Sequence, residues 1–468
     1  MDFELQDLAN KATIYAMSSG AQYCDARAEQ QERKSAVLEN SEVEHIKTNN
    51  DSGIGIRLNK KGTWGFCSIT NPDSFEQIKD AIDVAIKNAE HNIKDKKELY
   101  SNSVNKTKID FPVLKKPELE ELIKIGTECS KIILEVPKII KSVVSPWYTN
   151  NSKYFTNSEG SEITQNFTDV VVDMIATSHE SGLTQSVNIT EGGRGGLEQI
   201  TDKIYHSAQE IALKASQLLD AKPTKEEKAT VVMNPDFVSL LTHEILGHPS
   251  EADRVLGKEM AWAGSAWWKG KIGQKIGSEN LNVFDDPTIK ESLGWYYFDD
   301  EGVKTNKTTL VEKGVLKNHM QNRETAITFN IAPTGNMRAT NYRFMPLIRM
   351  ACTCIGKGDW NVDEMIKEVK NGYLISNMKI PSIDMQRYNW SISCQYAQKI
   401  ENGGITDLLR DVIVMGTAPE FFNSIDACGD DFTVRPITNC GKGDPMQSMI
   451  MGNGGPTIRG TATVKSVN

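Results

Sequence analysis

The sequence has no long hydrophobic run and no excess of positive charge. No apolar stretch approaches the roughly 18 residues that cross a membrane as a helix, and residues 1–5 are acidic and lack the apolar core of a signal peptide. These absences predict a cytoplasmic protein that does not cross a membrane. The formal net charge of −9 argues against a nucleic-acid-binding protein, because a surface that follows phosphates needs basic residues.

Cysteine is sparse, and its spacing does not indicate a four-cysteine metal site. The chain has 8 cysteines, which in a reducing compartment are expected to be thiols or metal ligands rather than disulfides. Cys352 and Cys354 are too close together for an ordinary zinc-binding pair, and no second pair completes a site. We interpret them as cysteines of a strand.

A phosphate-binding loop is also missing. Residues 191–196 read Glu-Gly-Gly-Arg-Gly-Gly, but they lack the Gly-Lys-Ser/Thr ending and the strand context of a nucleotide-binding loop. We therefore predict that residues 182–196 form a flexible lid or turn.

The length and the apolar periodicity predict an α+β protein of more than one domain. A chain of 468 residues exceeds what one hydrophobic core usually contains. Helical spacing of apolar residues occurs in four stretches, at 3–19, 74–90, 118–135 and 200–219. Strand-like patterns lie between them, so an N-terminal α+β domain is predicted over 1–222, with two similar halves joined near 91–116. Residues 223–468 are predicted to be β-rich.

Several strand predictions are specific enough to be compared with the structure. Strand-like alternation is present at 35–45 and 52–58, with a turn at 59–62. Four short strands are expected at 140–149, 152–157, 161–166 and 168–178. In the second domain, strands are expected at 229–233, 281–284, 294–298, 309–316, 372–379, 391–401 and 411–415.

Residues 243–248 read His-Glu-Ile-Leu-Gly-His, close to the zinc-hydrolase pattern H-E-x-x-H. In that pattern the histidines are four positions apart, about 40° around a helix, whereas His243 and His248 are five apart, about 140°. They cannot share a metal from a straight α-helix. Gly247 permits unusual dihedral angles, and Pro249 disfavours the α region for His248. We expect the helix to run to about Leu246 and then to bulge or unwind, so that His248 lies beside His243.

The segment before this motif places it on a buried helix. Asn234 is a candidate N-cap, Pro235 suits the first turn, and an apolar stretch follows. An unligated His-Glu-His cluster would be costly on such a helix. The motif alone nevertheless leaves a metal site and a structural cluster both open.

A catalytic zinc site takes three protein ligands and leaves one position for water. The acidic candidates for the third ligand are Glu251, Asp253, Asp285 and Asp286. Cys440 precedes a glycine turn near the C-terminus, and a thiolate suits zinc well. Spacing alone does not rank Cys440 above Glu251.

The sequence resembles the TldD/PmbA metalloprotease family. The motif that begins at His243 reads H-E-I-L-G-H-P-S-E-A-D, and further family motifs follow in the same order at 285–288, 298–302, 310–316, 334–339 and 440–442. The resemblance is close over 229–468 and looser over 1–228. A subgroup of the family (PmbA, also called TldE) lacks the metal motif, so this chain looks like the TldD-type member.

The resemblance implies a zinc site and a fold. It implies that His243, His248 and Cys440 bind Zn²⁺ and that Glu244 is the general base. The implied fold is an N-terminal α/β domain with an antiparallel sheet, followed by a β-rich domain that curls into a barrel-like shell. The stretch 254–280, which holds Met260, Trp262, Trp267 and Trp268, departs from the family pattern, and we expect its tryptophans to lie in the core.

The resemblance also implies partners and substrates. Family members form dimers around a cavity, so a homodimer or a heterodimer with a PmbA/TldE-like chain is expected. The implied substrates are small or unfolded peptides, which the β-rich wall could hold by strand addition. Glu251 and Asp253 could orient a ligand histidine. Two alternatives remain: a non-catalytic, chaperone-like peptide-binding partner with structural zinc, and a metal-dependent amidohydrolase that acts on non-peptide substrates.

Overall fold

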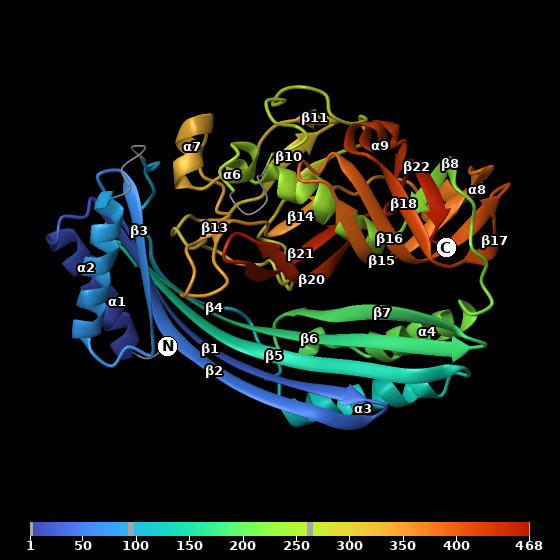
Figure 1. Cartoon of the computed structure of the whole chain (residues 1–468), viewed down its shortest axis with the longest axis horizontal. Helices are drawn as coiled ribbons and strands as arrows, with labels where there is room; N and C mark the ends of the chain where they lie inside the picture. The colour runs from blue at the N-terminus through green and yellow to red at the C-terminus, as the bar shows by residue number, and fades with distance from the viewer. Residues whose placement is uncertain (1–2, 92–97, 260–264, 468) are drawn as a thin grey trace.

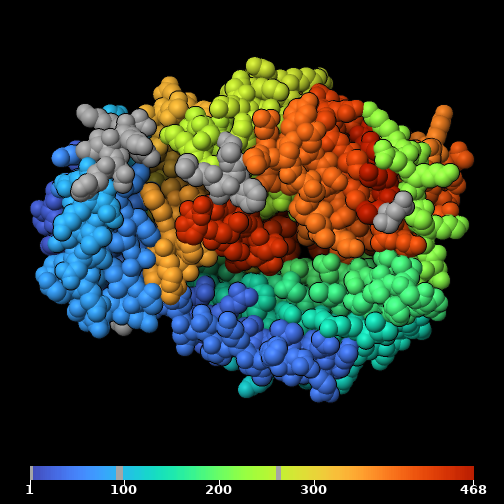
Figure 2. Space-filling model, in the orientation of Figure 1, coloured from blue at the N-terminus to red at the C-terminus, as the bar shows by residue number. Residues whose placement is uncertain are grey.

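The structure is a computed structural model that describes residues 3–91, 98–259 and 265–467. Figure 1 shows a long curved sheet from the first half of the chain lying beneath a more compact body from the second half. The space-filling view in Figure 2 shows the first half (blue to green) covering one side and one end of the second (yellow-green to red). In the part of the chain that is described, no helix is both long enough and apolar enough to cross a membrane.

The first half builds one seven-stranded sheet with helices at both ends. The strand order is β3-β2-β1-β5-β6-β4, with β7 also paired to β6, and all neighbours are antiparallel except β4 and β6. The strands are β1 (Tyr23–Glu39), β2 (Glu42–Lys60), β3 (Thr63–Thr70), β4 (Lys106–Asp110), β5 (Ile139–Asn157), β6 (Glu162–Glu180) and β7 (Leu183–Arg194). The helices are α1 (Phe3–Ser18), α2 (Phe75–His91), α3 (Leu119–Leu134) and α4 (Lys203–Gln217), with a 3-10 turn η1 (Leu197–Gln199).

Helices α1 and α2 pack on one end of the sheet and α3 and α4 on the other. The apolar faces predicted for these four helices are buried in two separate clusters of side chains. The order of helix, strands and helix therefore occurs twice along one continuous sheet. The division of the chain at 222/223 remains a prediction.

The prediction of four short strands over 140–178 was wrong, because β5 and β6 are continuous. Asn150 and Asn151, which read as a turn, pair with β1 in the middle of the sheet. Their amides make cross-strand hydrogen bonds: Asn150 Nδ2 donates to Glu32 and Gln31 Nε2 donates to Asn151, at 2.9 and 2.7 Å. Side-chain pairing across strands can outweigh a local turn preference.

The strand predicted over 35–45 is interrupted by a hairpin. Asn40 and Ser41 both have positive φ angles, 51° and 71°, which are typical of the tight turns that join antiparallel strands. The turn predicted at 59–62 is confirmed between β2 and β3.

The glycine-rich segment is not a lid. Most of residues 182–196 form β7, and the turn is confined to Ser181 and Gly182. Gly192 has a φ of 134°, and a Cβ there would collide with the Val170 carbonyl. The glycine therefore allows close approach of the neighbouring strand β6.

The second half contains a closed barrel and a second sheet, as the resemblance implies. Strands β15-β8-β22-β18-β16 form the barrel, which closes through pairing of β15 with β16; β17 extends β16. These strands are β8 (Glu227–Met233), β15 (Asn371–Ile383), β16 (Asn389–Glu401), β17 (Gly404–Leu409), β18 (Val412–Thr417) and β22 (Ile458–Ser466), with the short β19 (Ala427–Cys428) on β22.

The second sheet has the order β11-β10-β9-β14-β21-β20. Its strands are β9 (Val283–Asp285), β10 (Thr308–Glu312), β11 (Val315–Leu316), β14 (Cys352–Ile355), β20 (Thr433–Lys442) and β21 (Gln447–Gly455). Cys352 and Cys354 lie buried in β14, as predicted. The described residues of this half also form a two-stranded ribbon, five α-helices and two turns of other helix types. They are β12 (Met337–Arg338), β13 (Leu347–Ile348), α5 (Pro235–Thr242), the π turn η2 (His243–Gly247), the 3-10 turn η3 (His248–Ser250), α6 (Ala252–Val255), α7 (Arg323–Phe329), α8 (Val362–Lys367) and α9 (Ala418–Ser424).

The strand predicted over 294–298 is absent from the structure, although the others expected in this half are present in whole or in part. The aromatic residues of this segment pack against the first half instead of forming a strand. The Trp295 ring packs edge-on against Phe111 of the first half, with centroids 4.7 Å apart. Large aromatic residues favour strands locally, but here they fill the contact between the two halves.

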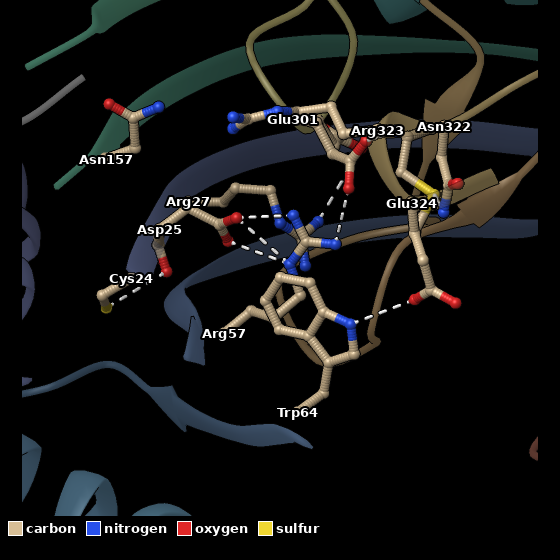
Figure 3. A network of polar contacts seen from close by, with 12 residues as sticks. Cys24, Asp25, Arg27, Arg57, Trp64, Asn157, Glu301, Asn322, Arg323 and Glu324 are labelled. Carbon is tan, nitrogen blue, oxygen red and sulfur yellow. Dashed lines mark hydrogen bonds and ion pairs between the residues drawn. The ribbon is translucent and has the colours of Figure 1, made fainter. Parts of the chain in front are cut away.

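A buried ion-pair network also joins the two halves (Figure 3). Arg57 of β2 lies between Asp25 of β1 and Glu301 of the second half, at 2.6 and 2.9 Å, and its guanidinium stacks on Trp64. The other Glu301 oxygen accepts the backbone N–H of Arg323 at 2.8 Å. Loss of one partner of such a buried pair leaves an uncompensated charge. The network therefore favours one arrangement of the two halves.

His319 is a buried histidine with a depressed pKa. Its ring lies against Phe329 and Trp268, with centroids 5.4 and 6.4 Å away, and neither ring nitrogen has a hydrogen-bond partner among the described residues. Burial lowers the pKa of His319 from its ordinary 6.5 to about 4. The ring is therefore neutral in the folded protein at neutral pH.

Replacing His319 with phenylalanine should reduce the pH dependence of stability. As the pH falls below 6.5, the unfolded chain takes up a proton that the folded chain accepts only near pH 4, so this contribution is present above 6.5 and is lost between 6.5 and 4. Between pH 8 and pH 5 the wild type should lose about 2 kcal/mol more unfolding free energy than the His319→Phe variant. Denaturant unfolding at both pH values measures the difference. His45→Gln, at an exposed histidine, is the control, and equal pH dependence of wild type and His319→Phe would contradict the assignment.

Candidate metal centre

Helix α5 positions the His-Glu-Ile-Leu-Gly-His motif. The Asn234 side chain accepts the Phe237 N–H at 3.0 Å and Pro235 occupies the first turn, so the predicted N-cap is confirmed. Phe237, Val238 and Leu241 are fully buried, and the helix packs against β15 and β21. The motif therefore starts from a rigidly packed element.

The two motif histidines meet because the helix widens into a π turn. Residues His243–Gly247 form this turn, and the His248 N–H donates to the His243 carbonyl. A hydrogen bond between positions five apart places those residues one turn apart. The imidazole centroids consequently lie 4.9 Å apart.

The bulge was predicted, but its position and its cause were not. The α-helical spacing ends at Thr242 rather than near Leu246. Gly247 and His248 both have right-handed helical dihedral angles, so neither glycine freedom nor the restriction before Pro249 produces the distortion. Gly247 is needed for packing instead, because a Cβ there would collide with the Met350 sulfur.

Two tryptophans stabilise the distorted turn. In a regular helix the Ile245 carbonyl would accept the N–H of residue 249, but proline has none. The Trp267 indole N–H donates to this carbonyl at 3.0 Å, and the Trp268 indole N–H donates to the Pro249 carbonyl at 2.6 Å. Both side chains are buried, as predicted, and they also satisfy the backbone behind the motif. Met260 and Trp262 lie outside the described residues.

Cys440 arrives at the motif from strand β20. The pairing of β20 with β21 shifts register between Ile437 and Cys440. The Cys440 sulfur lies 3.5 Å from His248 Nε2, and one ligand atom each of His243, His248 and Cys440 lie within 4.8 Å of one another. Nitrogen and sulfur ligands of one tetrahedral zinc ion would be about 3.6 Å apart. The three residues can therefore hold a metal ion.

Outer contacts orient both imidazoles toward the thiolate. His243 Nδ1 lies 2.9 Å from Asn453 Oδ1, and Asn453 Nδ2 donates to the Thr353 carbonyl, so the amide oxygen faces the imidazole. His248 Nδ1 lies 3.1 Å from Glu251. Each Nδ1 can thus carry a proton, which leaves Nε2 free to bind a metal ion.

The acidic candidates for the third ligand have other partners. Glu251 contacts His248 and also lies 3.1 Å from the buried ammonium of Lys442, which contacts Asp253 at 2.8 Å. Asp285 accepts hydrogen bonds from the Thr353 hydroxyl and from backbone N–H groups of β14, and Asp286 accepts from Thr288. Their oxygens do not belong to the three-residue cluster found among the described residues.

The electrostatics of the cluster favour a thiolate. Burial alone would raise the pKa of Cys440, but His243, His248 and Arg349 hold it well below its ordinary value. Burial alone would lower the pKa of His243, but the thiolate raises it to about 9. The pKa of His248 is well below its ordinary value because of burial, although Cys440 opposes the shift. These shifts favour the thiolate form of Cys440, which is the form that binds a metal ion.

A cleft of about 870 Å³ opens onto the three residues. Glu244 also lines it, and its carboxylate pairs with Arg387 from the loop between β15 and β16. Backbone and side chains of β20, β15 and β7 form the remaining walls. The motif glutamate and the three candidate ligands thus face one space.

Several residues of the site were not predicted from the sequence. Lys442 belongs to the family motif at 440–442, but the motif by itself does not indicate what its side chain contacts. Asn453 lies on β21, and Arg349 and Arg387 lie in loops, all far from the helix in sequence. Nothing in their local pattern distinguishes them from other polar residues.

Comparison with known proteins places the chain in a family. The PmbA/TldA metallopeptidase C-terminal domain matches residues 226–464, its domain 1 matches 24–89 and its central domain matches 112–219. A metalloprotease of Methanocaldococcus jannaschii is 31% identical over 98% of this chain and 100% of its own length. A zinc metalloprotease TldD homolog of Saccharolobus solfataricus is 26% identical over 94% of this chain and 95% of its own length.

Solved structures show the same fold. A Thermotoga maritima protein described as a candidate modulator of DNA gyrase superposes with a TM-score of 0.82 at 18% identity, covering 99% of this chain and 100% of that one. TldE from Thermococcus kodakarensis superposes with a TM-score of 0.75 at 19% identity, covering 98% and 99%. With the domain matches and the relatives at this identity and coverage, the chain belongs to the PmbA/TldD metallopeptidase family.

Proposed function

We propose that the protein is a zinc-dependent peptidase that cleaves small or unfolded peptides. The observation that supports this most directly is the convergence of two imidazoles, a thiolate and the motif glutamate on one cleft. Homologues named as metalloproteases support metal-dependent proteolysis in general.

His243, His248 and Cys440 would hold the zinc ion. Two nitrogens and one thiolate are ligands that zinc prefers, and three protein ligands leave a position for water, as in catalytic sites. When bound, zinc supplies a Lewis acid and lowers the pKa of a coordinated water. Glu251 and Asn453 hold the imidazoles in the tautomer that this role requires.

Glu244 is the proposed general base. It follows His243 directly and lines the same cleft, so its carboxylate can accept a proton from the attacking water. The same carboxylate would then return the proton to the leaving amine. The net reaction is the hydrolysis of one peptide bond by one water molecule.

The cleft suits an extended peptide. Strand β20 lies at the end of its sheet, with β21 on only one side, and residues 436–441 of this strand line the cleft. A free strand edge can bind a substrate through backbone hydrogen bonds, and such binding requires an extended chain while reading little sequence. This favours unfolded peptides over folded proteins.

The proposed assembly is a dimer that encloses the cleft. The similarity to TldE supports a heterodimer with a TldE-like chain, and a homodimer is the alternative. We also propose that residues 1–222 form one domain and that residues 223–468, which carry the metal site, form the other.

The rival reading of a structural zinc in a chaperone-like partner has less support. A structural zinc usually takes four protein ligands, whereas the cluster found among the described residues has three. An amidohydrolase acting on non-peptide substrates would use the same residues. Parallel assays with peptides and with small non-peptide amides distinguish the proposed peptidase from such an amidohydrolase.

Replacing Glu244 with glutamine should abolish hydrolysis without loss of zinc. The amide keeps the size of the side chain but cannot accept the proton, so the turnover of a disordered peptide should fall by about 100-fold or more. Metal content by elemental analysis and cleavage by mass spectrometry measure the two quantities. Glu420→Gln, at a surface carboxylate of the same half, should behave as wild type. Ordinary activity in Glu244→Gln would remove Glu244 from its role.

Replacing Cys440 with serine should weaken zinc binding by orders of magnitude. The hydroxyl stays protonated at neutral pH, whereas the buried thiol has a pKa well below its ordinary value. Competition with a chromophoric chelator measures the affinity. Cys428→Ser, at a buried cysteine that contacts Asn280 instead, is the matched control. An unchanged affinity in Cys440→Ser would return the third-ligand position to Glu251.

The zinc-loaded protein should cut denatured substrates and spare folded ones. A reduced, unfolded protein should be degraded at least about tenfold faster than the same protein in its folded form, because strand addition requires an extended backbone. Gel electrophoresis with matched substrate concentrations measures both rates. Equal rates would contradict binding in an extended conformation.

A further inference from the structure

Arg387 stands at the tip of the hairpin that joins β15 and β16, and it reaches into the metal cleft. Its φ is 60°, in the left-handed region that residues other than glycine rarely adopt. This conformation is typical of the tight turns that join antiparallel strands, and here it sets the backbone of Arg387 at the end of the turn.

The hairpin tip is held firmly in this conformation. The Asp384 carboxylate accepts the N–H groups of Tyr388 and Asn389, each at 2.9 Å, and the Arg387 N–H donates to the Asp384 carbonyl at 3.0 Å. The Trp267 N–H donates to the Gln386 carbonyl at 2.8 Å, which ties the tip to a tryptophan that supports the π turn. Trp267 therefore contacts both the hairpin tip and the π turn.

The Arg387 guanidinium makes a one-sided contact with Glu244. Its Nη1 pairs with Glu244 Oε2, and both side chains are mostly buried. Among the described residues, Glu244 Oε1 has no hydrogen-bond partner, and the remaining guanidinium N–H groups have none either. Arginine offers five donors, and both residues line the cleft, so one oxygen of the base and several donors remain available to a bound molecule.

We propose that Arg387 is a catalytic residue that stabilises the negative charge that develops on the carbonyl oxygen of the scissile peptide bond. This rests on the proposed peptidase function and names a residue that the metal motif does not contain. Through Nη1 the guanidinium fixes Glu244, and through its free N–H groups it donates to the substrate oxygen.

The negative charge develops on the substrate oxygen when water attacks the carbonyl carbon. The oxygen of the attacking water bonds to the carbonyl carbon, the carbonyl π electrons move onto the substrate oxygen, and the water proton passes to Glu244 Oε1. The electron pair then returns, the C–N bond breaks, and Glu244 gives its proton to the amine nitrogen. A thiolate ligand weakens the Lewis acidity of a metal, so a second cation at this oxygen is of particular use.

Two variants and a matched control test the role. Arg387→Ala should lower kcat about 100-fold, the usual effect of removing one oxyanion donor, with KM changed less than about threefold. Added methylguanidinium should restore part of the lost rate of Arg387→Ala, and it should leave the rate of the wild type unchanged. Arg387→Lys should keep an intermediate rate, because it retains the charge but not the planar fork. Lys370→Ala, at an exposed cation that directly precedes β15 and does not line the cleft, should keep kcat within about twofold.

A binding measurement provides a readout that does not depend on turnover. Calorimetry with a phosphinic peptide, whose anionic group mimics the tetrahedral intermediate, should show about 100-fold weaker binding to Arg387→Ala, whereas a peptide with an intact amide should bind both proteins equally. Thermal melting and zinc content of each variant establish that folding and metal binding are retained.

The outcomes separate this inference from the proposed function. If wild type cuts peptides and Arg387→Ala cuts them equally well, the role of Arg387 is overturned while the peptidase function stands. If wild type cuts no peptide, the proposed function fails, and the phosphinic peptide still decides whether Arg387 binds an anion. Equal loss of binding for the phosphinic peptide and the amide peptide would make Arg387 a structural residue and overturn the proposal.

Discussion

The candidate metal centre depends on one backbone hydrogen bond, from the N–H of His248 to the carbonyl of His243. In a regular α-helix these two side chains would point about 140° apart. The π turn brings their rings to a centroid distance of 4.9 Å. Everything else at the site, including the thiolate from β20, the carboxylate of Glu244 and the cleft, is arranged around this pair.

A π turn is sparsely populated in proteins, so its surroundings have to favour it. Here the tightly packed α5 precedes it, the Met350 sulfur occupies the space where a side chain at residue 247 would lie, and two indole N–H groups satisfy carbonyls that the turn and Pro249 leave without a partner. Trp267 and Trp268 therefore contribute to the site by hydrogen bonding to its backbone.

The buried charge of Lys442 is also stabilised by contacts with several residues. Lys442, fully buried, contacts Glu251 and Asp253, and Glu251 in turn contacts His248. A buried ammonium without such partners would be very unfavourable. Strand β20, which contains Cys440, thus also supplies, two residues later, the cation that contacts the carboxylate beside His248. Cys440 and Lys442 lie on the same strand, so the distance between them is fixed by the strand.

Local pattern was a reliable guide wherever local physics decides. The amphipathic helices, the Asn234 cap, the turn at 59–62 and the motif histidines with their glutamate could all be predicted, since helical periodicity and turn preferences act over a few residues. The same reasoning failed at Asn150 and Asn151, at residues 183–194 and at 294–298. There, cross-strand hydrogen bonds, close strand approach and packing between the two halves overrode the local preference.

The sequence by itself determined that a His-Glu-x-x-x-His segment lies on a buried helix that must be distorted, because five-residue spacing and apolar flanks are local properties. Only the tertiary structure decided how the distortion arises and which distant groups complete the site. Cys440, Asn453 and Arg387 lie between 143 and 210 residues away from their partners. Contacts over such separations are set by how the two sheets pack together, and a pattern of neighbouring residues does not encode that packing.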